Sequence, residues 1–201
     1  MNETREYFDS VAPGYSQNSK SSLWRWQRKK EVAAIQRLMS GETLGDVLEL
    51  ACGSGYYTRV LWERGCTRLV AVDFSLTMLQ ECHVEGCVKI AANIEEFVSG
   101  DRFDLVFCAG ALEFLLHPEA VFRNASQMLR ADGALVVLMP RASLAGLLYQ
   151  FFHWRHHVPV RLFGLEDIQR WAHMSGMKVI KWEKVSLFSM TAKLTKSENR
   201  A

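Results

Sequence analysis

The stretch Asp46-Val-Leu-Glu-Leu-Ala-Cys-Gly-Ser-Gly-Tyr-Tyr-Thr58 decides the fold of this chain. Its first five residues are mostly apolar and are typical of a strand that is buried on both faces of a sheet. Small residues follow from Ala51 to Gly55, and a helical pattern that includes Tyr57 and Leu61 comes next. A buried strand, a turn without bulky side chains and a helix together predict an α/β sheet with a ligand site where the strand ends.

The rest of the chain repeats this alternation of strand and helix. Helical stripes are expected at 118–130, with Pro118 in the first turn and Gly133 beyond the end, and at 165–175. The pattern predicts a Rossmann-like three-layer sandwich around a mostly parallel seven-stranded sheet, with one antiparallel strand near the C-terminus. After the first strand, the strands expected are 68–73, 88–92, 104–110, 134–140, 178–187 and 188–196.

The chain of 201 residues is long enough for one domain with a few added elements. We expect a single domain over 1–201, divided into an N-terminal helical cap (1–44), a cofactor-binding core (45–140), a lid insertion (141–164) and a C-terminal helix with strands (165–201). The cap and the lid interrupt the alternation, so both are expected to lie over the carboxyl ends of the strands, where open α/β sheets bind their ligands.

The charge, the cysteines and the lengths of the apolar runs indicate which partners and which compartment to expect. The formal net charge is only +2, so the chain has no strong positive field that would favour binding to nucleic acid. No nucleic-acid partner is therefore expected. Five cysteines, an odd number without a C-x-x-C pair, predict reduced thiols. The N-terminal stretch lacks the pattern of a signal peptide, and the apolar runs are too short to span a membrane. These features predict a cytoplasmic protein.

Polar residues at the strand ends indicate the ligand. The turn is not the dinucleotide fingerprint, because Thr58 stands where the third glycine would be, and Glu49 would repel a pyrophosphate. Asp73 ends the second strand, where a carboxylate can accept both hydroxyls of a ribose. Asn93 and Ile94 follow the third strand and could hold the edge and the face of an adenine. Together they predict a nucleoside with a positive or zwitterionic tail.

Five motifs in order resemble those of the class I S-adenosylmethionine-dependent methyltransferases, in the branch of small-molecule and quinone-type enzymes. The match runs from about Tyr7 to the end of the tail, and Ala51 replaces the first glycine of the family's glycine-rich motif. The motifs are Y-F-D-S-V-A-P-G-Y (7–15), E-L-A-C-G-S-G (49–55), V-D-F-S-x-x-M-L (72–79), F-D-L-V-F-C-A-G-A-L-E-F (103–114) and L-R-A-D-G-A-L (129–135).

The resemblance implies S-adenosylmethionine as the cofactor and S-adenosylhomocysteine as the product. It places the methionine portion on Glu49 and the 51–55 backbone, the ribose on Asp73, and the methionine amino group on the Ala109 carbonyl. Asn93 stands where the family usually has Asp, and an amide accepts from the adenine amine more weakly than a carboxylate does. The cofactor residues so implied are Glu49, Ala51, Cys52, Gly53, Gly55, Asp73, Phe74, Met78, Asn93, Ile94 and Ala109.

Some of these residues also have a simpler structural explanation. Asp73 could be only the cap of the helix that follows it. Cys52 is explained by its small size, since no histidine is placed to activate a nucleophilic thiol. His117 is the candidate catalytic base, and its alternative role is to cap the helix that begins at Pro118.

No metal site is expected. Glu113 stands where quinone-type O-methyltransferases have an L-E-H triplet that is thought to hold a divalent metal, but Phe114 replaces the histidine and Gly110 replaces a second acid. The histidines at 153, 156 and 157 have helical spacing, but 141–164 contains no Asp or Glu. We interpret these histidines as polar-face or pocket residues.

The cap and lid carry the information on the acceptor. Segments 20–30 and 141–161 combine basic residues with aromatic and aliphatic ones, which gives three alternatives: ordinary packing with a solvated basic face, an acceptor pocket, or a helix on a lipid surface. The acceptor-site candidates are Tyr15, Trp26, Phe151 and Arg155.

The sequence therefore predicts methyl transfer by direct in-line displacement to a small hydrophobic or amphipathic acceptor, such as a quinone precursor, a lipid or a secondary metabolite. Two alternatives stay open: a nucleic-acid or protein methyltransferase, and a non-enzymatic regulator that binds S-adenosylmethionine.

Overall fold

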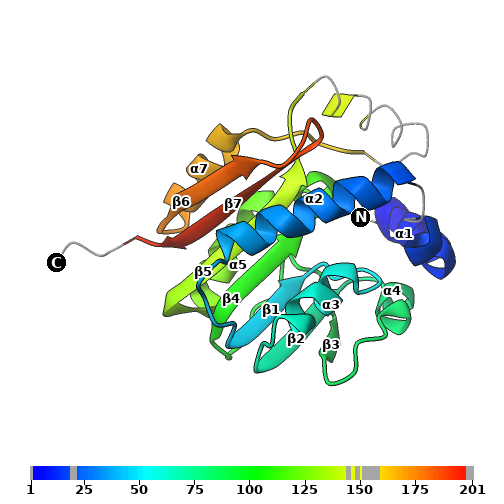
Figure 1. The fold of residues 1–201 in the computed structure, drawn as a ribbon, viewed down its shortest axis with the longest axis horizontal. Coiled ribbons are helices and arrows are strands. Elements are labelled where there is room, and N and C mark those ends of the chain that lie inside the picture. Colours follow the sequence, from blue (N-terminus) through cyan, green and yellow to red (C-terminus); the bar gives the residue numbers. More distant parts are fainter. Residues whose placement is uncertain (1, 19–21, 144–145, 148–149, 151–158, 198–201) are drawn as a thin grey trace.

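The computed structural model describes residues 2–18, 22–143, 146–147, 150 and 159–197. A seven-stranded sheet has the order β3-β2-β1-β4-β5-β7-β6 (Figure 1). Neighbours from β3 to β5 are parallel, and β7 is antiparallel to both β5 and β6. The predicted fold class is confirmed. The strands are β1 (Asp46–Leu50), β2 (Arg68–Asp73), β3 (Val88–Ala91), β4 (Phe103–Ala109), β5 (Leu129–Pro140), β6 (Met177–Lys184) and β7 (Ser189–Lys196).

Helices cover both faces of the sheet and make the outer two layers. One apolar cluster joins α2 and α3 to the sheet, and a larger one joins α5 and α7 to its other face. A short 3-10 turn, η1 (Leu112–Phe114), follows β4. The described helices are α1 (Asn2–Asn18), α2 (Ser22–Leu38), α3 (Tyr56–Glu63), α4 (Leu76–Glu81), α5 (Pro118–Met128) and α7 (Leu165–Met174).

Two strands differ from the prediction. The nearly continuous apolar run 88–92 predicts a strand buried on both faces, but β3 lies at the edge of the sheet, and Val88 is 49% exposed. β5 begins at Leu129, where we expected the helix to continue to Arg130. Leu129 pairs with Phe103 before a register shift, and a Cβ on Gly133 would lie 2.9 Å from the Phe103 carbonyl oxygen. This close approach requires glycine inside the strand, so Gly133 does not terminate the helix.

The cap helices lie in two different places, and only one was expected. α1 contacts α4 and reaches the carboxyl ends of the strands, as predicted. Most of α2 instead covers a face of the sheet, where Ile35 and Met39 pack with Val47 and Phe107 (Figure 1). An apolar stripe of this length is more stable against the sheet than over its end, because burial there removes more apolar area from water. Half of the expected lid (141–164), including the segment 151–158, lies outside the described residues.

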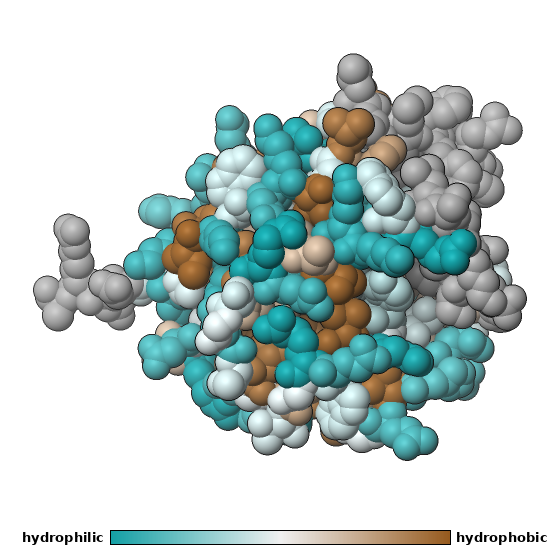
Figure 2. All heavy atoms as spheres, in the orientation of Figure 1, coloured by the Kyte–Doolittle hydropathy of each residue, from teal (hydrophilic) through white to brown (hydrophobic). Residues whose placement is uncertain are grey.

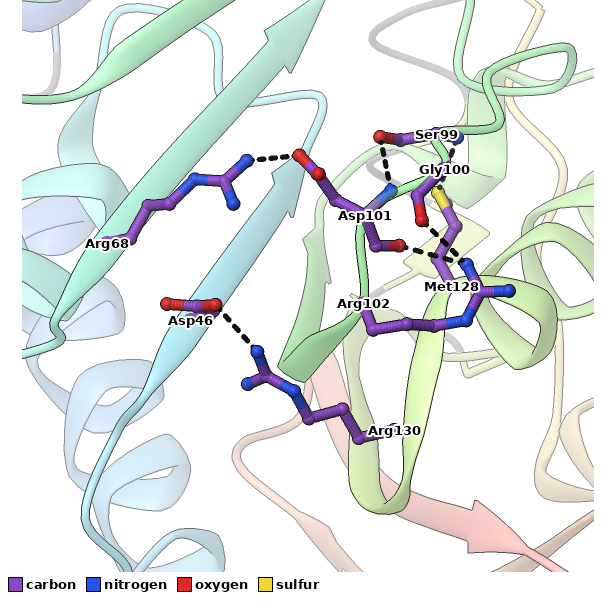
Figure 3. Close-up of polar contacts among 8 residues, drawn as sticks. All are labelled: Asp46, Arg68, Ser99, Gly100, Asp101, Arg102, Met128 and Arg130. Carbon is purple, nitrogen blue, oxygen red and sulfur yellow. Dashed lines mark hydrogen bonds and ion pairs between the residues drawn. The ribbon is translucent and has the colours of Figure 1, made fainter.

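The amino ends of the strands, opposite the ligand site, are joined by charged side chains (Figure 3). The Arg68 guanidinium contacts Asp101, and Arg130, at the start of β5, reaches Asp46 at 2.8 Å. Arg130 also contacts Asp104, so one guanidinium connects two neighbouring strands. These exposed pairs fix the ends of β1, β2 and β4 and place no charge near the carboxyl ends.

The face covered by α2 and α3 is mostly hydrophilic, with hydrophobic residues visible between the polar ones (Figure 2). Within the described ranges, no helix has both the length and the apolar composition that a membrane span requires. All five cysteines are free.

Candidate active site

One cavity of about 350 Å³ opens at the carboxyl ends of β1, β2 and β4. α1 and α2 supply part of its wall, and the loops after four strands supply the rest. Its lining residues are Thr4, Arg5, Phe8, Arg28, Ala51, Cys52, Gly53, Ser54, Tyr56, Tyr57, Asp73, Phe74, Leu76, Met78, Ala91, Ala92, Asn93, Ile94, Glu95, Ala109, Gly110, Ala111, Phe114 and Leu115. Nine of the eleven predicted cofactor residues are among them, and Glu49 and Gly55 are not.

The loop from Ala51 to Gly55 presents bare backbone to this cavity. Gly53 has a φ of 53°, and a Cβ built on it would meet nothing within 4 Å, so the open side of the loop faces free space. Gly55 has a φ of 85° and packs so closely on α4 that a Cβ would lie 2.5 Å from the Cys82 sulfur. The first glycine therefore leaves room for a ligand, and the second allows α3 to begin close to α4.

Ala51 occupies a conformation that favours glycine, because its φ is 59°. A non-glycine residue there costs about 1–2 kcal/mol. This strain accounts for the glycine that the family usually has at the position.

We therefore expect Ala51→Gly to raise the free energy of unfolding by up to about 1 kcal/mol, after the entropy that glycine gains in the unfolded chain is subtracted. Ala125→Gly, in the middle of α5, is the matched control and should lower it by about 1 kcal/mol. Urea denaturation of both variants measures the two changes, and a destabilised Ala51→Gly would contradict the account of strain.

Asp73 lies at the end of β2 and connects the loop to α4. Its carboxylate accepts the Gly53 N–H at 2.8 Å and the Ser75 N–H at 2.9 Å. Burial raises the pKa of Asp73 above its usual value, although these backbone donors oppose the shift. Ser75, and not Asp73, is the cap of α4, because its hydroxyl accepts the Met78 N–H at 3.0 Å. A buried carboxylate that lines the cavity and is not the cap suits a ribose with two hydroxyl donors.

Asn93 and Ile94 line the cavity from the loop after β3. The Asn93 amide oxygen accepts the Glu95 N–H at 3.1 Å, and its nitrogen donates to Glu96 at 3.0 Å. An amide oxygen has a second lone pair, so this turn still leaves it able to accept from a ligand. Ile94 is 4% exposed and offers a fixed apolar face.

Glu49 does not contact the cavity, which corrects the direct role expected for it. It lies behind the loop and is 2% exposed, and its Oε2 has no hydrogen-bond partner among the described residues. Burial raises the pKa of Glu49 to about 8, while a hydrogen bond from Thr58 acts in the opposite direction. Glu49 therefore packs behind the loop, next to Thr58 of α3, and does not face a ligand in the cavity.

Glu113 has a similar environment at the end of β4. It is 2% exposed, its Oε2 also has no partner in the described part of the chain, and burial raises its pKa to about 8. Its backbone carbonyl accepts the Arg161 N–H at 2.9 Å. The described residues contain no group of three His, Cys, Asp or Glu side chains that could hold a metal ion.

Aromatic rings form one wall of the cavity. The Phe8 ring meets Phe74 and Phe114 edge to face, with centroids 6.2 Å and 5.2 Å apart. The Asp9 carboxylate of α1 contacts the Ser75 hydroxyl, which ties this wall to the end of β2. The replacement of a histidine by Phe114, noted in the sequence, thus contributes an apolar surface to the site.

Two basic side chains that we did not select also line the cavity. Arg28 lies 5.0 Å from the centroid of Tyr56 and 5.1 Å from that of Tyr57, and Arg5 extends from α1. Arg28 belongs to the basic run at 20–30, but periodicity alone could not show which of its residues faces the site. The motif at 7–15 signalled that α1 takes part, without indicating Arg5 or Phe8.

The residues chosen for catalysis and for the acceptor fit less well. His117 is 74% exposed, precedes α5 and contacts Glu119 at 3.3 Å outside the cavity, so its position does not suit a general base. Trp26 is 48% exposed, with the Lys30 ammonium 3.7 Å above its ring, and does not line the cavity either. The Tyr15 side chain, and Phe151 and Arg155 as a whole, lie outside the described residues.

Residues 48–137 match the family model described as a methyltransferase domain. Among curated proteins, the chain is 27% identical over 117 residues to trans-aconitate 2-methyltransferase of Enterobacter sp. (strain 638), a match covering 57% of this chain and 46% of that protein. It is 31% identical over 126 residues to tRNA U34 carboxymethyltransferase of Shewanella frigidimarina (strain NCIMB 400), covering 58% and 36%. The chain thus spans about a third to a half of the length of these relatives.

Solved structures extend the likeness to nearly the whole chain. The complex of DhpI with SAH has a TM-score of 0.77 and 18% identity, covering 98% of this chain and 97% of the other. Magnesium protoporphyrin IX methyltransferase (ChlM) from Synechocystis PCC 6803 has a TM-score of 0.74 and 15% identity, covering 98% and 100%.

The fold is a Rossmann-like domain with a cavity at its glycine loop. Residues 48–137 match a methyltransferase domain, and solved methyltransferase structures share the fold, which supports the predicted family, the class I S-adenosylmethionine-dependent methyltransferases.

Proposed function

We propose that this chain transfers the methyl group of S-adenosylmethionine to a small hydrophobic or amphipathic acceptor by direct in-line displacement. One observation carries the proposal: a single cavity joins a nucleoside-type polar site with an aromatic and aliphatic wall. S-adenosylmethionine supplies an activated sulfonium methyl group when it is bound. The chain extends over 1–201 as one domain in this proposal, with 45–140 as the cofactor-binding core.

The residues present fit this cofactor. Asp73 would hold the ribose, Asn93 and Ile94 the adenine, and the Ala109 carbonyl the amino group. Arg28, whose guanidinium lies over the rings of Tyr56 and Tyr57 and 3.7 Å from the Glu31 carboxylate, suits the carboxylate of the methionine portion. Phe8, Phe74, Phe114 and Leu115 would exclude water from the acceptor.

Positioning, rather than proton transfer, is the main contribution that this site offers to the reaction. Histidine is absent from the described lining of the cavity. An acceptor nitrogen or a carbanion-like carbon needs little help from a base, whereas a hydroxyl needs its proton removed. The site therefore favours an acceptor whose nucleophile requires no strong base, held close to the methyl group.

The names of the relatives suggest acceptors of several kinds. They include trans-aconitate, malonyl-[acyl-carrier protein] and tRNA, and another solved neighbour is a putative methyltransferase in complex with the Trm112 activator. We favour the small molecule because the cavity wall is apolar and aromatic. The absence of a nucleic-acid partner and the cytoplasmic location stay predictions.

The proposal is tested by calorimetry on the purified chain. S-adenosylmethionine and S-adenosylhomocysteine should bind, because the loop and Asp73 suit a nucleoside with a zwitterionic tail, whereas NAD should not, because Thr58 replaces the third glycine of a dinucleotide site. Binding of NAD without a response to the sulfonium compound would contradict the proposal. Cofactor binding without transfer of a labelled methyl group to any apolar acceptor would favour the regulator instead.

A further inference from the structure

We propose that the surface around the mouth of the cavity docks on an anionic lipid bilayer. This docking surface consists of residues 24–29 of α2, the described residues 141–143 and 146–147 after β5, and the turn 185–188 between β6 and β7. It does not depend on methyl transfer and adds a partner to the site, a membrane from which an amphipathic acceptor could enter.

Hydrogen bonds place these three segments next to one another. The Gln27 amide of α2 donates to the Ser189 hydroxyl at 2.8 Å, where β7 begins. The Arg141 N–H donates to the Phe188 carbonyl at 2.9 Å, and the Ser143 hydroxyl donates to the Leu187 carbonyl at 2.8 Å. Figure 1 shows the start of α2 and the β6–β7 turn at the same side of the molecule. The three segments thus form one continuous surface.

Large apolar side chains are exposed on each of these segments. Leu187 is 72% exposed, Leu147 is 53% exposed and Trp24 is 49% exposed. Phe188, beside Leu187, is 36% exposed. A single exposed leucine needs no explanation, but four large apolar residues on adjoining segments indicate a surface that is covered in use.

Positive side chains border this surface. Arg25 and Lys29 are exposed one helical turn apart on α2, and Arg141 follows β5. The nearby acid, Glu31, is buried and accepts hydrogen bonds from Gln27 and the Tyr57 hydroxyl, both at 2.7 Å. Anionic lipid head groups attract such a cluster by about 1 kcal/mol for each Lys or Arg near the surface.

A bilayer fits this combination better than a nucleic acid does. Tryptophan is favoured at the membrane interface, where its ring is amphipathic. Leucine gains by entering the acyl boundary, whereas a base stacks on aromatic rings and gains little from an aliphatic side chain. The exposure of Leu147 and Leu187 therefore favours a lipid bilayer over a nucleic acid as the partner.

The surface lies next to the cavity. Trp24 stands one helical turn before Arg28, which lines the cavity. Arg161 donates to the carbonyl of Leu115, another lining residue, and to that of Leu116 at 2.8 Å, and Leu116 is 60% exposed. A bilayer against this surface would meet the same mouth through which an acceptor enters.

Co-sedimentation of the full chain with vesicles tests the proposal. The chain should bind vesicles of phosphatidylglycerol mixed with phosphatidylcholine, and bind pure phosphatidylcholine at least tenfold more weakly. Leu187→Ser should weaken binding to the mixed vesicles about tenfold, and Arg25→Glu combined with Lys29→Glu should weaken it by tenfold or more. High salt should reproduce the effect of the charge changes.

Two matched controls lie away from this surface. Met174→Ser, at the end of α7, changes a side chain that is 68% exposed, and Arg102→Glu reverses a charge at the amino ends of the strands (Figure 3). Both should bind like the unchanged chain. Calorimetric titration with S-adenosylhomocysteine should give the same affinity for all variants, so that a failure of the proposed function is seen separately.

Equal binding to neutral and mixed vesicles, or no binding to either, would overturn the proposal. So would an effect of Leu187→Ser no larger than that of Met174→Ser. If only the charge changes weaken vesicle binding, the exposed apolar residues do not enter the bilayer, and the proposed docking surface is wrong.

Discussion

Replacement of Asp73 by alanine is expected to weaken the binding of S-adenosylhomocysteine by about a hundredfold or more. The ribose hydroxyls would lose their hydrogen bonds to the Asp73 carboxylate, each worth about 1.5–3 kcal/mol because the acceptor is charged. The Gly53 N–H, which donates to Asp73 at 2.8 Å, would also lose its partner, so the loop would no longer be held toward the cavity.

Asp101→Ala is the matched control, because Asp101 is exposed and pairs with Arg68 at the opposite end of the strands (Figure 3). Its affinity should equal that of the unchanged chain. Titration calorimetry measures both variants, and urea denaturation shows whether each still folds. A folded Asp73→Ala variant with unchanged affinity would mean that Asp73 only connects the loop to α4.

The second large effect concerns pH. Burial raises the pKa of both Glu49 and Glu113 from 4.5 to about 8. In the unfolded chain both groups lose their proton near pH 4.5, whereas the folded chain keeps it until about pH 8. The stabilising contribution of each neutral carboxyl is therefore fully present below about pH 4.5 and is lost as the pH rises through about 8.

We expect the free energy of unfolding to fall between about pH 5 and pH 8, by up to about 1.4 kcal/mol for each pH unit and each group. Glu113→Gln removes one of the two groups, so the dependence on pH should become about half as steep. Glu85→Gln, at an exposed position, is the control and should leave the slope unchanged. Urea denaturation at several pH values measures the free energy of unfolding of each variant. If Glu113→Gln leaves its dependence on pH unchanged, Glu113 is ionised in the folded chain.

The family could be predicted from the sequence because its signals are local. A buried strand, a glycine turn and a carboxylate at the end of the next strand depend on residues that are close along the chain. The Asp73 position, its distance from Gly55 and the exclusion of a dinucleotide all follow from such spacing. The same holds for nine cofactor candidates that line the cavity.

The acceptor side could not be predicted in this way, because it is built from segments far apart in the sequence. Trp26 and Arg28 are two residues apart on α2, and only the packing of that helix shows that Arg28 faces the cavity while Trp26 faces solvent. The pattern likewise could not place His117 outside the site, because the direction of the chain after β4 depends on η1 and its contacts with Arg161.

The sequence by itself determined the Rossmann-like fold, the antiparallel strand near the C-terminus and nine of the residues that line the cavity, because the pattern of apolar residues and the turn chemistry act over short distances. Only the tertiary structure decided which face of α2 is buried, that Glu49 supports the loop from behind, and that Phe8 and Phe114 close the cavity. Those outcomes depend on how side chains from separate segments fill a common space, and no local pattern records that.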